Sequence, residues 1–176
     1  MLAELKPLAD AMLFVFIPGT EAGNAIANAL CGDVNPSGRL SMSFLDAEGQ
    51  LPIYYSRLRT VRPKKKSDEE FGIFTASYYK GHNQPLYPFG YGLSYTQFKY
   101  GKIFLSKDTL RVNETITVSV SVKNVGKRAG KETILLYIQD TISSFVRREK
   151  ELKGFKKIYL EPGRKRRLSL AFVSGC

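Results

Sequence analysis

The sequence predicts two fold classes in one chain of 176 residues: an α/β segment over about residues 1–96 and an all-β sandwich over about residues 97–176. Three observations support this division: a βα pattern near the N-terminus, strict polar and apolar alternation in the second half, and a change in charge near Thr96. With 43% hydrophobic and 24% charged residues, the composition is that of a globular protein, which excludes a disordered or collagen-like chain.

The first half opens with a pattern typical of one βα unit. Residues 11–17 (AMLFVFI) form a continuous apolar run that predicts a strand buried on both faces of a parallel sheet. Thr20 is expected to cap a helix that ends at Gly32, because apolar residues recur between them at helical spacing. One strand makes no sheet, so the other strands of this layer are expected to lie outside the chain.

The second half alternates with a period of two, which is typical of half-buried strands. In residues 115–122 (TITVSVSV) every second residue is Ile or Val, and the residues between them are Ser or Thr. Further strands are expected at residues 98–105, 133–139, 152–158 and 168–172, with turns at residues 124–126 and 162–163. Five short strands predict a β-sandwich that is two strands short of seven and has an open edge.

Positive charge gathers in the second half. Residues 97–176 hold 18 Lys/Arg and 7 Asp/Glu, whereas residues 1–96 hold nine of each. Such a cluster raises the question of nucleic acid or another polyanion, such as an acidic polysaccharide, as a partner. The sequence contains no helix-turn-helix, zinc-finger, RNP or KH motif, so no nucleic-acid partner is expected. A basic, non-enzymatic module that binds a polyanion stays an alternative.

The sequence offers few residues for a metal site and no segment that could span a membrane. The chain has two cysteines and a single histidine, His82, too few for a four-ligand zinc site. No apolar run approaches the roughly 18 residues of a membrane span. Charged residues at Glu4, Lys6 and Asp10 interrupt the N-terminus, so no signal peptide is recognised in this chain.

Four motifs carry a family resemblance. Residues 18–40 (PGTEAGNAIANALCGDVNPSGRL) resemble the late part of the α/β sandwich domain in family 3 glycoside hydrolases, of the β-glucosidase and β-xylosidase type. Similar motifs follow in the family's order: GQLPIYY at 49–55, PLYPFGYGLSYTQF at 85–98 and ELKGFKKIYLEPG at 151–163. The resemblance implies a partial α/β sandwich segment followed by an incomplete fibronectin type III-like β-sandwich.

The resemblance also implies a function. The chain would be a C-terminal fragment of a β-glucosidase-like hydrolase of O-glycosyl bonds, and it would support a catalytic barrel that the chain lacks. Retaining glycosidases use two carboxyl groups about 5 Å apart. In the resembled family both lie upstream of Met1, so no catalytic residue is assigned and the chain alone is expected to be inactive.

Further expectations follow from the same resemblance. It implies no metal and no organic cofactor, and a glycoside substrate reached through the missing domain. It also implies a secreted or periplasmic location. The oligomeric state is left open.

Four tyrosines are the candidate sugar-binding residues: Tyr54, Tyr55, Tyr78 and Tyr79. A tyrosine offers a rigid ring and a hydroxyl, so it can stack on a sugar and bond to its oxygens. Residues 50–79 are expected to form loops that could face the active site of a complete enzyme. Packing of these rings in a core or interface is the competing interpretation, and a carbohydrate-binding module is a further alternative for the chain as a whole.

Overall fold

A computed structural model describes residues 2–58, 78 and 83–174 of the chain. They divide into two compact units that interleave along the sequence. The first unit comprises Met1–Phe14, Leu40–Tyr91 and Ile138–Glu151, and the second comprises Val15–Arg39, Gly92–Tyr137 and Leu152–Cys176. Each unit is described by itself.

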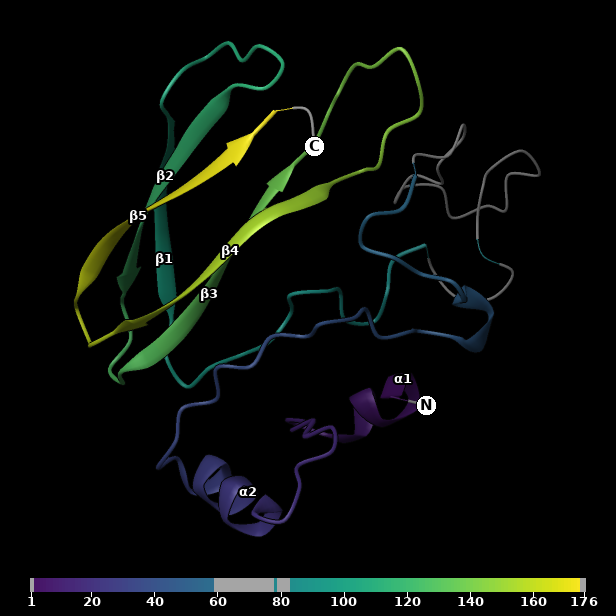
Figure 1. Ribbon diagram of the computed structural model, residues 1–176. Helices are drawn as coiled ribbons and strands as arrows, with labels where there is room; N and C mark the ends of the chain where they lie inside the picture. Colours follow the sequence, from purple (N-terminus) through teal and green to yellow (C-terminus); the bar gives the residue numbers. More distant parts are fainter. Residues whose placement is uncertain (1, 59–77, 79–82, 175–176) are drawn as a thin grey trace. The chain divides into compact units, whose positions relative to one another are not determined.

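The second unit contains a β-sandwich of two layers (Figure 1). One layer is an antiparallel sheet in the order β1-β2-β5, formed by β1 (Phe98–Leu105), β2 (Thr115–Asn124) and β5 (Lys165–Val173). The other pairs β3 (Gly130–Ile138) with β4 (Glu151–Leu160). All five predicted strands are therefore confirmed.

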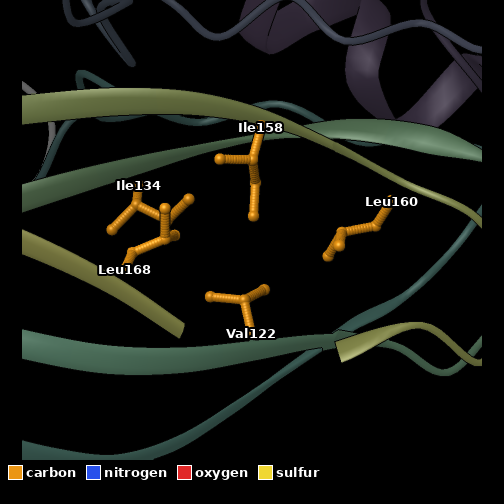
Figure 2. Close-up of a cluster of buried hydrophobic side chains, with 5 residues drawn as sticks. All are labelled: Val122, Ile134, Ile158, Leu160 and Leu168. Carbon is orange, nitrogen blue, oxygen red and sulfur yellow. The ribbon is translucent and has the colours of Figure 1, made fainter. Parts of the chain in front are cut away.

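The core lies between these two layers. Five apolar side chains, each at most 6% exposed, form one cluster: Val122, Ile134, Ile158, Leu160 and Leu168. Figure 2 shows them pointing into the space between the ribbons. The alternation in β2 follows from this packing: Val122 is buried in the core and Val120 packs against it, whereas Lys123, next along the strand, is exposed.

A buried polar residue, Asn124, closes one end of the sandwich. Its Oδ1 accepts hydrogen bonds from Thr96 Oγ1 (2.7 Å) and from the Gly126 N–H (3.0 Å). Its Nδ2 donates to the carbonyls of Arg128 (2.8 Å) and Leu160 (3.0 Å). The side chain is fully buried with all four hydrogen-bonding positions used. It therefore ties β2 to the segment before β1, to the following turn and to β4.

The helices are short. They are α1 (Leu2–Leu5), α2 (Ala22–Cys31) and two 3₁₀ turns, η1 (Lys6–Leu8) and η2 (Glu48–Gln50). Helix α2 ends as predicted at Gly32, whose φ of 84° is left-handed. The predicted Thr20 cap is wrong: Glu21 precedes the helix, and its carboxylate accepts a hydrogen bond from Asn24 (2.7 Å). In the part of the chain that the structure describes, no helix has the length and hydropathy of a membrane span.

The predicted strand at residues 11–17 is also wrong. These residues adopt no strand, and their side chains are exposed, up to 97% at Ile17. A strand forms by hydrogen bonding to a neighbour, and no described strand pairs with this run. The apolar pattern is present, but no strand among the described residues pairs with it.

Truncation of a core side chain should destabilise the sandwich strongly. We expect Leu168→Ala to lower the free energy of unfolding by about 2–4 kcal/mol, because it leaves a cavity in the cluster. The control is Leu93→Ala, at a residue that is 75% exposed, with an expected change below about 0.5 kcal/mol. Urea unfolding of both variants checks this; equal midpoints would contradict the assigned core.

Loss of the Asn124 side chain should cost a similar amount for a different reason. Asn124→Ala leaves two donors and two carbonyls without partners, so we expect about 2–4 kcal/mol of destabilisation. Asn24→Ala removes an exposed amide with one bond to Glu21 and should be nearly neutral. Thermal unfolding that shows the same midpoint for the two variants would refute the role given to Asn124.

Candidate functional site

Aromatic side chains gather in the first unit. Phe44 and Tyr87 form an isolated β-bridge, with Phe44 N–H donating to the Tyr87 carbonyl at 2.8 Å. The ring of Tyr87 stacks on Tyr91 with centroids 4.9 Å apart, and Tyr55 stacks on Phe89 at 4.5 Å. Offset stacking stabilises such pairs beyond simple burial. The segment 85–91 and the loop at Tyr55 are therefore packed against each other.

The four predicted tyrosines differ in their surroundings. Tyr54 is 63% exposed and makes no hydrogen bond or ring contact within the described residues. Tyr55 is partly buried by its stack on Phe89. The Tyr78 hydroxyl donates to the Pro52 carbonyl at 2.7 Å, and Tyr79 lies outside the described residues. Of the three described tyrosines, Tyr54 is exposed, whereas Tyr55 and Tyr78 are partly buried.

The side chain of Gln50 fixes the loop that carries Tyr54. This side chain is fully buried, and its Oε1 accepts hydrogen bonds from the N–H groups of Asp46 (2.6 Å) and Ala47 (3.4 Å). Its Nε2 donates to the Gln84 carbonyl at 3.0 Å. The sequence analysis missed this role, although the glutamine at the second position of the GQLPIYY motif is a signal that could have suggested it.

Arg57 fixes the other side of the same loop. Its Nε lies 3.0 Å from Glu149 Oε2, and its Nη1 donates to the Asn83 carbonyl at 2.8 Å. Beside it, Arg148 Nη1 donates to the Ser56 carbonyl at 2.8 Å. Residues 54–58 are thus held on two sides, which is the condition for presenting an exposed side chain in one geometry.

In the second unit, the arginine of the NPSGRL motif is an anchor. Arg39 Nη2 lies 2.6 Å from Glu132 Oε2, and the two side chains are only 11% and 13% exposed. The second oxygen of Glu132 accepts a hydrogen bond from the Tyr100 hydroxyl at 2.8 Å. Burial is the main cause that raises the pKa of the Tyr100 hydroxyl, and its hydrogen bond to Glu132 raises this pKa further. Both oxygens of Glu132 are engaged, so its position is that of a structural carboxylate.

The other described ion pairs also occupy carboxylates. Glu149 faces Arg57, Asp140 lies 3.8 Å from Arg147, and Glu114 lies 2.8 Å from Lys107. The hydrogen bond from Lys107, together with one from the Arg111 N–H, lowers the pKa of Glu114. A general acid in glycoside hydrolysis needs the opposite, a raised pKa.

Metal ligands are equally scarce. Within the described ranges, no group of three or more His, Cys, Asp or Glu side chains is placed to hold a metal ion. The acidic run at residues 68–70 lies outside the described residues. Within the first unit, the described residues offer packed aromatic rings and the Arg57–Glu149 ion pair around one exposed tyrosine, Tyr54.

Comparison with family models gives two matches. The model described as "Glycosyl hydrolase family 3 C-terminal domain" matches residues 1–95. The model described as "Fibronectin type III-like domain" matches residues 132–172. These matches confirm both the family resemblance and the α/β plus β-sandwich fold class.

Curated relatives cover almost the whole chain. It is 48% identical over 161 residues to the periplasmic β-glucosidase of Salmonella typhimurium, with 92% of this chain and 21% of that protein covered. It is 44% identical over 151 residues to a β-xylosidase of Formosa agariphila, with 86% and 20% covered. The chain thus spans about a fifth of the length of the curated relatives it matches.

Solved structures agree with this. The β-glucosidase of Listeria innocua in complex with isofagomine superposes with a TM-score of 0.89 at 42% identity, covering 97% of this chain and 24% of that one. The β-glucosidase 3B of Thermotoga neapolitana in complex with glucose gives 0.72 at 29%, covering 97% and 24%. Because a family model accounts for more than half of its residues and these relatives for most of the rest, the chain belongs to glycosyl hydrolase family 3, in the part described as its C-terminal domain.

Proposed function

We propose that this chain is the C-terminal, supporting part of a β-glucosidase-type hydrolase of O-glycosyl bonds, and that other segments of the enzyme carry the catalytic carboxylates. The observation that carries the proposal is the alignment of nearly the whole chain with about a fifth of each relative. The glycoside substrate would then be bound mainly by those other segments. Since one relative is named periplasmic, we place the enzyme in the periplasm or outside the cell.

An apolar segment with exposed side chains supports this proposal. The large side chains at residues 12–17 are between 38% and 97% exposed. A continuous exposed patch of this kind is typical of a surface that another element covers. In the complete enzyme we expect another segment to cover this run and remove its apolar side chains from water.

A cleft in the sandwich supports it as well. Between the two sheets of the second unit lies an open cleft of about 170 Å³, lined mainly by apolar side chains that include Ile103, Val118, Leu136 and Leu170. An apolar opening into a core is unfavourable in water. We propose that additional chain closes it in the assembled enzyme.

The domain division belongs to the same proposal. We place the boundary near Thr96, with the end of the α/β sandwich domain over residues 1–96 and the fibronectin type III-like sandwich over residues 97–176. The family 3 match ends at residue 95. Thr96 is buried and bonded to Asn124 of the sandwich, which supports a boundary at this point.

Among the tyrosines, we propose that Tyr54 contacts sugar. Its ring is open, and Gln50 and Arg57 fix the loop that presents it. Tyr55 and Tyr78 would support this loop through the Phe89 stack and the Pro52 carbonyl. Tyr79 remains a candidate from its sequence position.

A chimera can test whether this chain supports the enzyme while other segments carry the catalytic residues. We expect the purified 176-residue chain to leave 4-nitrophenyl β-D-glucoside unhydrolysed. The Salmonella typhimurium relative should keep its hydrolytic activity when its matching segment is replaced by this chain, and should lose it when that segment is deleted. Turnover by the isolated chain would contradict the proposal, as would a folded chimera with no activity.

The role of Tyr54 can be tested in the same chimera. If its ring stacks on a sugar, Tyr54→Ala should raise KM about two- to twelvefold, the effect of losing roughly 0.5–1.5 kcal/mol of stacking. Tyr54→Phe keeps the ring and should stay close to the parent KM. The kinetics with 4-nitrophenyl β-D-glucoside and with a disaccharide decide, and an unchanged KM in Tyr54→Ala would exclude the contact.

A further inference from the structure

Three lysines lie in one row across the sheet of β1, β2 and β5. The strand register places Lys99 directly opposite Lys123, and Lys123 directly opposite Lys165. Residues opposite one another share a face, with Cβ atoms about 5 Å apart. All three are exposed, and their neighbours Tyr100 and Val122 point to the other face, where Val122 is buried in the core. The row therefore lies on the outer face of the sheet, opposite to the face on which Val122 joins the core with side chains of β3 and β4.

The lysine row is defined as Lys99, Lys123 and Lys165. Within the described residues, none of the three side chains forms an ion pair or hydrogen bond. Like charges directly opposite one another destabilise a sheet, each pair by a fraction of a kcal/mol. The folded chain bears this cost, which an anion bound along the row would remove.

The surface next to the row is low and polar. Ser121 pairs with Arg167, and Ser119 pairs with Ser169, with 2.8 Å between the two serine hydroxyls. Opposite Ser121, a Cβ added to Gly101 would lie only 2.3 Å from the serine hydroxyl. Gly101 and the serines thus keep the face shallow between β1 and β2, and the exposed Arg167 adds a further cation beside them, so that an extended ligand can lie across the strands without entering a pocket.

The same face distinguishes between two polyanions. Its one large ring, Phe104, lies under the Arg167 guanidinium, 5.2 Å from the ring centroid. Proteins that bind single-stranded nucleic acid need several open rings for base stacking, and the major groove of DNA admits a helix or a two-stranded ribbon. A three-stranded face with one covered ring fits neither. Ammonium groups over a hydroxyl-lined surface fit a polymer of sugars with carboxylates.

We propose that the outer face of the β1-β2-β5 sheet binds a linear acidic polysaccharide, with successive carboxylates along the row from Lys99 through Lys123 to Lys165. Strands in a sheet are about 4.8 Å apart, so the row offers one ammonium per strand to a chain that crosses the strands. The site is separate from glycoside hydrolysis and needs no catalytic residue. It would hold the enzyme on an anionic matrix.

The experiment measures binding of the full 176-residue chain to polygalacturonate at neutral pH over a range of NaCl concentrations. We expect salt-sensitive binding that weakens about tenfold or more in the triple variant Lys99→Gln, Lys123→Gln, Lys165→Gln, the loss of three exposed charge contacts. The matched control is Lys127→Gln, Lys131→Gln, Lys157→Gln, which removes the same charge from exposed positions off this face. It should bind within about twofold of the parent.

A stability readout separates ligand binding from a structural role. Removal of the repulsion should leave the thermal midpoint of the row variant equal to or above that of the parent, while Lys123→Arg should retain binding. If both triple variants weaken binding equally, the loss of net charge alone explains the effect, and the proposal is overturned. Unchanged binding in the row variant would also overturn it, as would tighter, row-dependent binding of a DNA oligonucleotide than of polygalacturonate.

Discussion

The sandwich depends on one buried amide. Asn124 is the only side chain in the described residues seen to join the entry segment at Thr96, the turn after β2 and the end of β4 through four hydrogen bonds. Apolar packing alone is non-directional and would hold the two layers together in more than one register. A fully satisfied polar group selects one arrangement, because any shift leaves a buried donor or acceptor without a partner. The position of every outward-facing residue on β2 follows from that choice.

The strands could be predicted because their signal is local. Alternation at residues 115–122 requires only that one face of the strand be buried, and the chain supplies the second layer that buries it. Residues 11–17 carry an equally strong apolar signal, but a buried parallel strand needs partners from beyond its own βα unit. The sequence therefore showed that both segments are suited to form a strand. Among the described residues, only the segment at 115–122 pairs with neighbouring strands.

The site illustrates a different limit. Motifs located the right loops, yet they could not show that Gln50 and Arg39 are anchors while Tyr54 is open. A buried glutamine and an exposed one look the same in a sequence, because the difference lies in carbonyls that are distant along the chain, such as that of Gln84. The lysine row shows the same limit in a sheet: its members lie 24 and 42 residues apart, and only the strand register brings them together.

Within the second unit, charge and hydropathy distinguish the surfaces that an assembled enzyme can cover. Closing the apolar cleft between the sheets would remove hydrophobic surface from water, which stabilises the assembly by about 25 cal/mol per Å². Covering the lysine row with protein would instead desolvate three ammonium groups, at a cost of several kcal/mol each unless a carboxylate met every one. The cleft is thus suited to further segments of the enzyme. The outer face of β1, β2 and β5 is suited to water or to a hydrated anionic polymer that can pair with the ammonium groups without excluding solvent.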